Sequence, residues 1–289
     1  ADCVGDRWCP PFAVDDARWS ARTCLAGDRL PTASRVCGAR GCRAKSLAAQ
    51  RCPCPDVAVI VSAMGVGSGV APYGAALWDA APVIPVVDIA SVDDAVPVAQ
   101  SLAAGGIRVI EVTLRTPAAL PAIAEIAAEC PDVTVGAGTV RSVVDVERAL
   151  EAGARFLVTP GTPGVLAATL MGSGVPCLPG VSTVTEAMSL ADRGFGTVKF
   201  FPAAALGGPA WIRAVAGPLP DLRVVPSGGV SLSNASDYLG LPTVPCVAAS
   251  WLTPRALVEG GDWEGITGLA RQALEVLRPH WSRARSERL

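Results

Sequence analysis

Short apolar runs alternate with longer amphipathic stretches from about residue 74 onward. This alternation is typical of repeated βα units that form a parallel sheet. The apolar runs predict eight strands, at residues 83–87, 108–113, 133–137, 155–159, 175–178, 197–201, 223–226 and 244–248. The stretches between and after them predict helices at residues 92–104, 117–129, 143–152, 163–171, 183–191, 209–216, 232–239 and 263–277. The predicted fold class is therefore α/β, a (β/α)8 TIM barrel, with an N-terminal helix at residues 73–80 that caps it.

Local signals support these elements and favour a barrel over an open sheet. Ser91 and Asp94 have the spacing of a capping box at the start of the first helix. Thr183 and Glu186 repeat this pattern at a later helix. The Gly105-Gly106 pair predicts a helix end, because glycine is favoured just past a helix C-terminus. An open doubly wound sheet is the alternative, but the G-x-G-x-x-G pattern that would favour it does not follow the first strand.

Residues 1–63 differ from the rest of the chain and are expected to lie outside the barrel. Seven of the ten cysteines fall within the first 54 residues, among many Arg, Trp and Pro residues with no sustained helix or strand period. A small disulfide or zinc module is one interpretation, although the Cys37–Cys42 and Cys52–Cys54 spacings differ from the usual zinc-binding spacing. A disordered tail is the second interpretation. The favoured one is a mis-set translation start, with Met64 preceding the regular domain.

Length and composition fit a large core and exclude several classes of partner. The 289 residues accommodate a barrel at residues 74–280 and a tail at residues 281–289, since such barrels run to about 250 residues. Hydrophobic residues make up 51% and charged residues 17%, which excludes a chain that is disordered throughout. A net charge of -2 argues against nucleic acid, and no apolar run approaches a membrane helix. Residues 1–30 lack the apolar core of a secretory signal, so a cytoplasmic protein is expected.

Lys199 is the first candidate for chemistry. Only two of the 24 Lys and Arg residues are lysines, Lys45 and Lys199. In the predicted strand at residues 197–201, alternation directs Thr197, Lys199 and Phe201 to one face. A lysine is rarely buried without a partner or a purpose, and a desolvated lysine can form a Schiff base whereas arginine cannot. The alternative is a lysine whose stem is buried and whose ammonium group reaches the barrel rim.

Glu111 is the second charged residue inside a predicted strand. In residues 108–113, the side chains of Val109, Glu111 and Thr113 share one face. A barrel allows Glu111 on the second strand to meet Lys199 on the sixth in the interior. A buried structural ion pair is the alternative, but such pairs contribute little stability because desolvation of both charges offsets their attraction. A carboxylate beside an imine-forming lysine can instead move protons at the neighbouring carbon.

Further candidates lie at the C-terminal ends of the strands, where barrels carry their active sites. Arg115 follows the second strand, and its guanidinium fork suits a carboxylate; an exposed arginine at a helix start is the alternative. Gly228 and Gly229 follow the seventh strand, and Ser250 follows the eighth. This is the usual position of a barrel phosphate site, where glycine lets backbone N–H groups approach the anion. Other strand ends carry Thr139, Pro160 and Phe201.

Six motifs occur in a single order along the chain. They are Glu111-Val-Thr-Leu-Arg115-Thr, Gly136-Ala-Gly-Thr139-Val, Pro179-Gly-Val-Ser-Thr183-Val, Val198-Lys199-Phe-Phe-Pro202-Ala, Pro226-Ser-Gly-Gly229-Val and Ser250-Trp251. In this order they resemble the 2-keto-3-deoxy-6-phosphogluconate (KDPG) aldolases, which are class I, Schiff-base aldolases of the Entner–Doudoroff pathway. The resemblance covers about residues 74–278 and leaves out residues 1–63. Ser227 stands where many members have threonine, and no loss is expected from that difference.

The resemblance implies a role for each candidate residue. Lys199 forms the imine, and Glu111 is the general acid and base. The resemblance also implies no metal, no cofactor and a homotrimer. The binding roles that it implies are the pyruvate carboxylate for Arg115 and Thr139 with the turn at Gly161, the pocket wall for Pro160 and Phe201, and the phosphate for Gly228, Gly229 and Ser250.

The reaction that the resemblance implies is reversible cleavage of 2-dehydro-3-deoxy-6-phosphogluconate to pyruvate and glyceraldehyde 3-phosphate, with these small molecules as partners and no nucleic acid or membrane. Cleavage of 4-hydroxy-2-oxoglutarate (KHG) or of the galactonate epimer is an alternative with the same lysine chemistry. The second carboxylate of KHG would be expected to bind an arginine near Ser250. The loops after the last two strands contain none, which favours a phosphorylated substrate. An alternative of another class is a non-catalytic sugar-phosphate binding barrel, which has no need of Lys199 and Glu111 together.

Overall fold

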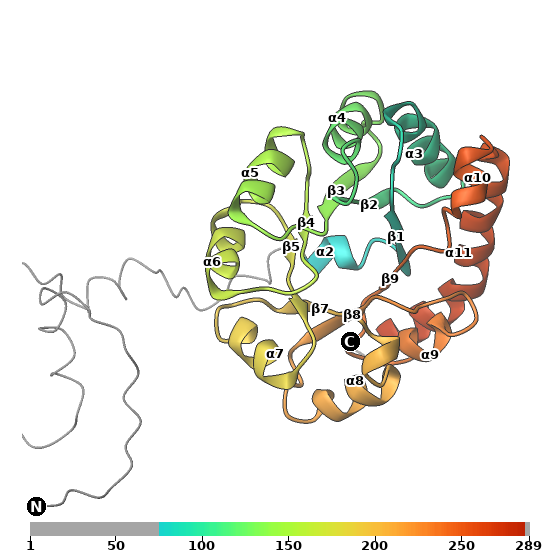
Figure 1. The fold of residues 1–289 in the computed structure, drawn as a ribbon. Coiled ribbons are helices and arrows are strands. Elements are labelled where there is room, and N and C mark those ends of the chain that lie inside the picture. Colours follow the sequence, from blue (N-terminus) through green and yellow to red (C-terminus); the bar gives the residue numbers. More distant parts are fainter. Residues whose placement is uncertain (1–74, 287–289) are drawn as a thin grey trace, which may run out of the picture. The chain divides into compact units, whose positions relative to one another are not determined.

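The parallel strands of this protein curl into a barrel-like sheet (Figure 1). A computed structural model describes residues 75–286. Its strands hydrogen-bond in the orders β5-β4-β3-β2-β1-β9 and β6-β7-β8, and a bridge between Ser227 and Ala248 joins the end of β8 to β9. The predicted α/β class with a parallel sheet is confirmed. The strands are β1 Val83–Val87, β2 Val109–Thr113, β3 Thr134–Gly138, β4 Leu157–Val158, β5 Cys177–Leu178, β6 Gly180–Val181, β7 Thr197–Phe200, β8 Arg223–Pro226 and β9 Val247–Ala249.

Helices alternate with the strands and surround the sheet (Figure 1). None of those within residues 75–286 is long and apolar enough to span a membrane. The expectations for residues 1–63 fall outside the described part of the chain. The helical elements are α2 Ala75–Trp78, η2 Val92–Asp94, α3 Ala95–Ala104, α4 Ala119–Glu129, α5 Val143–Glu151, α6 Gly164–Gly172, α7 Val184–Ala191, η3 Ala204–Leu206, α8 Pro209–Ala216, α9 Ala235–Leu239, α10 Arg255–Glu259 and α11 Trp263–Ser286.

Two local predictions were wrong for reasons visible in the backbone. Ser91 makes no side-chain cap, because residues Val92–Asp94 form a 3-10 turn in which the Asp94 N–H donates to the backbone carbonyl of Ser91 at 3.2 Å. The fifth predicted strand, at residues 175–178, is reduced to β5, and a second short strand, β6, which was not predicted, follows after Pro179. Proline has no N–H for the sheet ladder, so it interrupts the strand there. The second predicted capping box, at Thr183 and Glu186, is confirmed.

Strand β2 illustrates how alternation sorts side chains between the two faces of the sheet. Ile110 and Val112 are fully buried in the large cluster between sheet and helices, together with Ile123 of α4. Burial of an isoleucine of this kind stabilises the fold by about 1.5–3 kcal/mol. Val109 belongs instead to a smaller cluster on the inner face of the sheet. Because residues two apart share a face, the same pattern places Glu111 in the interior.

The inner face is apolar toward the N-terminal ends of the strands. Trp78 of α2 is fully buried there, and its ring meets the edge of Phe156 with centroids 5.7 Å apart. The same cluster contains Ile84 of β1, Val158 of β4 and Val225 of β8. Val225 is in register with Lys199, so apolar side chains fill the interior up to the level of the lysine.

The start of helix α7 is fixed to the end of strand β7. Thr183 and Glu186 form a reciprocal capping box, and the Ser182 backbone N–H also donates to the Glu186 carboxylate at 2.7 Å. These hydrogen bonds, that of Ser182 foremost, hold the pKa of Glu186 below its usual value. The Ser182 hydroxyl donates to the carbonyl of Phe201 at 2.8 Å. The loop after β6 is therefore tied to the residue that follows β7.

Candidate active site

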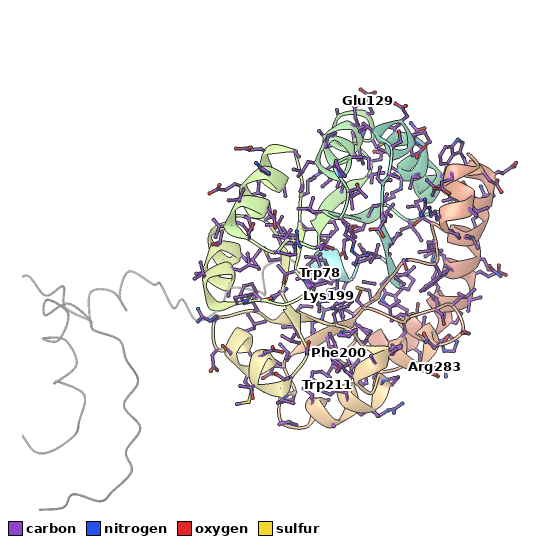
Figure 2. All side chains as sticks on the ribbon, in the orientation of Figure 1. Trp78, Glu129, Lys199, Phe200, Trp211 and Arg283 are labelled. Atoms are coloured by element: carbon purple, nitrogen blue, oxygen red, sulfur yellow. The ribbon has the colours of Figure 1, made fainter. Side chains whose placement is uncertain are left out.

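Lys199 lies in the middle of the sheet, on strand β7. It pairs with Gly180 of β6 and Val225 of β8, and its backbone N–H donates to the Pro179 carbonyl at 2.8 Å. The next residue, Phe200, points outward and stacks on Trp211 of α8 with ring centroids 4.0 Å apart (Figure 2). Alternation along the strand therefore turns Lys199 inward, as the sequence predicts.

The structure brings Lys199 and Glu111 together. The Lys199 Nζ lies 3.3 Å from Glu111 Oε1, and the two side chains are 7% and 1% exposed. The two residues are 88 positions apart in the sequence, on β7 and β2. Among the described residues, the second carboxylate oxygen, Oε2, is buried and has no hydrogen-bond partner. A buried acceptor of this kind is costly in free energy, and it can take a proton from a group that reacts at the amine.

Phe201 lies beside the amine, and Gly228 packs against its ring. The Lys199 Nζ is 5.5 Å from the centroid of the Phe201 ring. A Cβ at Gly228 would lie 3.0 Å from the same ring, so glycine allows the loop after β8 to approach the end of β7. The peptide bond between Phe201 and Pro202 is cis. The Phe201 ring, between Gly228 and the amine, can form a wall next to Lys199.

Strand β3 passes close to Glu111 because it ends in glycine. A Cβ at Gly138 would lie 2.2 Å from Glu111 Oε1, closer than atoms can approach. The next residue, Thr139, has a left-handed backbone with φ of 58°, a conformation that costs about 1–3 kcal/mol for a residue other than glycine. Such strain is found most often at functional sites. The strained residue Thr139 thus lies next to Gly138, the glycine that leaves room for the Glu111 carboxylate.

Replacement of Gly138 by alanine tests this packing. We expect Gly138→Ala to lower kcat/KM about 100-fold, because the new methyl group displaces Glu111, and a misplacement of about 1 Å has that effect. The measurement is steady-state kinetics of the cleavage that the resemblance implies. Gly172→Ala in α6 is the matched control, since a Cβ there meets nothing within 4 Å. Wild-type kinetics for Gly138→Ala would contradict the placement of Glu111.

The loops after β8 and β9 lie next to each other at the same end of the sheet. Gly228 and Gly229 have φ of 88° and 74°, which favour glycine. A Cβ at Gly229 would lie 2.5 Å from the Cβ of Ala204, so this position also has no room for a side chain. The bridge between Ser227 and Ala248 places the exposed Ser250 just beyond the neighbouring strand.

Pro160 stands in a tight junction between β4 and β6. A Cβ at Gly180 would lie 2.4 Å from the Pro160 carbonyl carbon, so the two chains touch through their backbones. The fully buried Thr159 accepts a hydrogen bond from the Gly180 N–H at 2.9 Å. Its hydroxyl also lies 2.8 Å from that of Thr162. These contacts fix Pro160 one strand away from Lys199, because Gly180 pairs with Lys199.

Arg115 has a partner that the sequence did not point out. Its Nη1 lies 3.3 Å from Asp88 Oδ2, and the two side chains are 51% and 54% exposed. The other carboxylate oxygen of Asp88 accepts a hydrogen bond from the buried Thr113 hydroxyl. Asp88 follows β1 directly, so its position at a C-terminal strand end was the signal that could have identified it.

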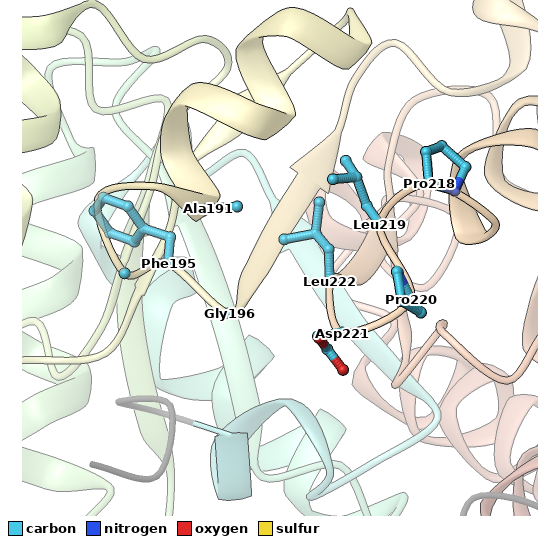
Figure 3. Close-up of a pocket in the computed structure, with 9 residues that line it drawn as sticks. Ala191, Phe195, Gly196, Pro218, Leu219, Pro220, Asp221 and Leu222 are labelled. Carbon is cyan, nitrogen blue, oxygen red and sulfur yellow. The ribbon is translucent and has the colours of Figure 1, made fainter. Parts of the chain in front are cut away.

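A separate cleft lies at the opposite, N-terminal ends of β7 and β8 (Figure 3). It has a volume of about 300 Å³, and its lining includes Phe195, Pro218 and Leu222. It contains none of the predicted site residues. Within residues 75–286, no cluster of three or more His, Cys, Asp or Glu side chains could hold a metal ion.

Comparison with known proteins identifies relatives of this chain. Residues 76–269 match the model of the aldolase family described as KDPG and KHG aldolase. The 2-dehydro-3-deoxy-phosphogluconate aldolase of Pseudoalteromonas atlantica is 48% identical over 193 residues, which are 67% of this chain and 90% of the relative. The KHG/KDPG aldolase of Escherichia coli K12 is 47% identical over 195 residues, which are 67% of this chain and 91% of the relative.

Solved structures agree with these relatives. The KDPG aldolase of Legionella pneumophila, which captured pyruvate as a covalent carbinolamine intermediate, matches with a TM-score of 0.68 at 40% identity, over 69% of this chain and 97% of that one. The Zymomonas mobilis enzyme, crystallised with 3-phosphoglycerate, matches with a TM-score of 0.65 at 39% identity, over 69% of this chain and 93% of that one. The chain therefore belongs to the KDPG and KHG aldolase family.

Proposed function

We propose that this chain cleaves 2-dehydro-3-deoxy-6-phosphogluconate to pyruvate and glyceraldehyde 3-phosphate through an imine on Lys199. The observation that carries the proposal is the buried pair of Lys199 and Glu111, whose Nζ and Oε1 atoms lie 3.3 Å apart. A sugar-phosphate binding barrel without activity gives no reason to bury two opposite charges, which contribute little to stability. The covalent carbinolamine of the Legionella relative supports the same route here.

The first half of the reaction forms a covalent bond between enzyme and substrate. Lys199 transfers a proton to Glu111, and its neutral amine attacks the C2 ketone to give a carbinolamine. Glu111 protonates the C2 hydroxyl, which leaves as water, and a protonated imine remains. The positive nitrogen of this imine is the electron sink for the next step.

The second half of the reaction breaks the carbon chain. Glu111 accepts the proton of the C4 hydroxyl, the C3–C4 bond breaks, and its electron pair moves onto C3 as an enamine while the imine nitrogen becomes neutral. Glyceraldehyde 3-phosphate leaves with a new aldehyde at the former C4. Glu111 then protonates the enamine carbon, and water hydrolyses the imine to release pyruvate and Lys199. One carboxylate that moves protons in both directions suffices for this sequence.

The remaining site residues are proposed to bind the two ends of the substrate. Arg115 and Thr139, with the turn at Gly161, take the carboxylate, because a guanidinium fork matches its two oxygens. Pro160 and Phe201 line the pocket beside the imine. Gly228, Gly229 and Ser250 take the phosphate at the adjoining ends of β8 and β9, where backbone N–H groups and a hydroxyl are available.

The lack of cationic side chains in the sequence around Ser250 favours a phosphorylated substrate over KHG. A second carboxylate at that end would be expected to meet a cation, and the residues from Ser227 to Pro254 contain no Lys or Arg. Arg255 comes next, and its Nε is paired with Glu259 Oε1 at 2.7 Å. KHG is a second candidate substrate, because the relative from Escherichia coli is a KHG/KDPG aldolase.

The experiment that tests this function compares the three substrates with the purified protein. Pyruvate release is followed from KDPG, its galactonate epimer and KHG. We expect the highest kcat/KM for KDPG, and about a tenfold higher KM for KDPG in Ser250→Ala, the size of one lost hydrogen bond to a charged group. The KM for KHG in the same variant is the internal control and should not change. A preference for KHG in the wild type would replace the proposed substrate.

We further propose the assembly and setting expected from the family resemblance, a cytoplasmic homotrimer. Helix α6 supports self-association, because its sequence is apolar on all sides, while Val165 and Met171 are 73% and 53% exposed. A helix that is apolar all round is usually covered. Light scattering on the purified protein measures the number of chains. We also propose that β5 and β6 are halves of one strand of a closed eight-stranded barrel, with α2 as its cap; the buried Trp78 supports that cap.

A further inference from the structure

Asp88 connects the loops that follow the first two strands of the sheet. It is the residue after β1, and it contacts two residues near the end of β2, Thr113 and Arg115. A third contact joins the same two loops, because the Thr116 hydroxyl donates to the backbone carbonyl of Ile89. The two loops are therefore fastened by one side chain and one backbone group, on the edge of the sheet where the proposed active site lies.

The two oxygens of Asp88 have different partners. Oδ1 accepts a hydrogen bond from Thr113, whose side chain is fully buried and belongs to the same face of β2 as Glu111. Oδ2 lies 3.3 Å from Arg115 Nη1. The contact with Thr113 fixes the Asp88 carboxylate to the sheet. The contact with Arg115 then restricts the position of its guanidinium group, which would otherwise be flexible.

Only Nη1 of Arg115 is engaged by Asp88 in the described part of the chain. A guanidinium group has further N–H donors on its remaining edges, and two parallel hydrogen bonds from one edge match a carboxylate. The ion pair is half exposed, and such pairs contribute little to stability. The main effect of this ion pair is therefore to orient Arg115 and not to stabilise the fold.

We infer that Asp88 is a positioning residue, which holds Arg115 so that its free edge receives the substrate carboxylate. This inference rests on the proposed function, in which Arg115 binds that carboxylate. It assigns Asp88 a part in substrate affinity without contact between Asp88 and the substrate. A correctly placed carboxylate also presents the C2 ketone to Lys199, so the effect extends to imine formation.

Two other roles for Asp88 predict different results. Asp88 could serve only as an acceptor for the buried Thr113 hydroxyl, in which case Asn at this position would replace it fully. Asp88 could also compete with the substrate carboxylate for Arg115, in which case its removal would improve substrate affinity. Positioning predicts weaker affinity for Asn as well as Ala. Asn has a single acceptor oxygen, so when that oxygen accepts from Thr113 its NH2 group, a donor, faces Arg115.

The experiment uses Asp88→Asn and Asp88→Ala, each in the wild type and with Arg115→Ala. Steady-state cleavage of KDPG gives KM and kcat. Borohydride trapping compares pyruvate with hydroxyacetone, a ketone that lacks the carboxylate. We expect both Asp88 variants to raise KM about tenfold, the size of one charge-assisted hydrogen bond, and to slow trapping of pyruvate but not of hydroxyacetone. With Arg115→Ala already present, the Asp88 changes should add nothing.

Several outcomes overturn the inference. A lower KM in the variants would mean that Asp88 competes with the substrate, and wild-type kinetics in Asp88→Asn would leave it as a partner of Thr113 alone. Equal losses for pyruvate and hydroxyacetone, or losses that persist beside Arg115→Ala, would indicate general damage to the fold. These failures leave the wild-type pyruvate adduct intact, whereas a wild type that traps no pyruvate would overturn the proposed function and this inference together.

Discussion

Lys199→Ala is expected to abolish aldol cleavage and to remove the covalent adduct with pyruvate. The amine is the only group in the site that can form the imine, so kcat should fall by at least about four orders of magnitude. The change also leaves the carboxylate of Glu111 buried without its cation. Removal of one partner from such a pair destabilises a protein by about 3–5 kcal/mol, so a lower melting temperature should accompany the loss of activity.

Intact mass after treatment with pyruvate and borohydride measures this directly. The wild type should carry one reduced pyruvate adduct, and Lys199→Ala should carry none. The chain offers a matched control, because Lys45 is its only other lysine. Lys45→Ala should keep the adduct and the activity. An adduct that survives in Lys199→Ala, or one that disappears in Lys45→Ala, would place the imine elsewhere.

Glu111→Gln is expected to leave the imine chemistry possible but to remove the proton transfers. Glutamine has the shape of glutamate, so the packing around Gly138 is kept, while its amide cannot act as a base. General acid–base catalysis contributes about 10²–10⁴-fold, and kcat should fall by that factor. The trapped pyruvate adduct should still form, more slowly, since the nucleophile is intact.

Exchange of the pyruvate methyl protons with deuterium from solvent isolates the step that Glu111 performs. The wild type should exchange them through the enamine, and Glu111→Gln should lose the exchange even where the imine has formed. Glu125→Gln, on the exposed face of α4, is the control for a change of charge and should behave as the wild type. Exchange at the wild-type rate in Glu111→Gln would assign the proton transfers to another group.

The sequence predicted the strands from local periodicity, and the meeting of the two charges from that periodicity together with the predicted barrel. Alternation placed Glu111 and Lys199 on one face of their strands, and closure of the sheet allowed that face to be the interior. The ion pair of Asp88 with Arg115 could not be predicted in the same way. It depends on side-chain rotamers in two loops, and neither residue has a periodic pattern around it.

The last helix extended further than the sequence indicated. The pattern predicted an end at residue 277, yet α11 continues to Ser286 with Pro279 inside it, although proline usually breaks a helix. Tertiary contacts offset the lost backbone hydrogen bond. The Trp281 indole N–H donates to the carbonyl of Pro245 at 2.6 Å, and Ala284 is buried. Such contacts join distant parts of the chain, which a local pattern does not record.

The position of Lys199 on a central strand has a consequence for the dynamics of the enzyme. Its backbone is hydrogen-bonded between β6 and β8, and neighbouring Phe200 is stacked under α8. Local fluctuations that open loops at low free energy therefore leave the reactive amine in place, because its displacement requires the sheet itself to separate. The backbone amides of Lys199 and Glu111 are therefore expected to be among the slowest to exchange with solvent, and those of the loops after β8 and β9 among the faster.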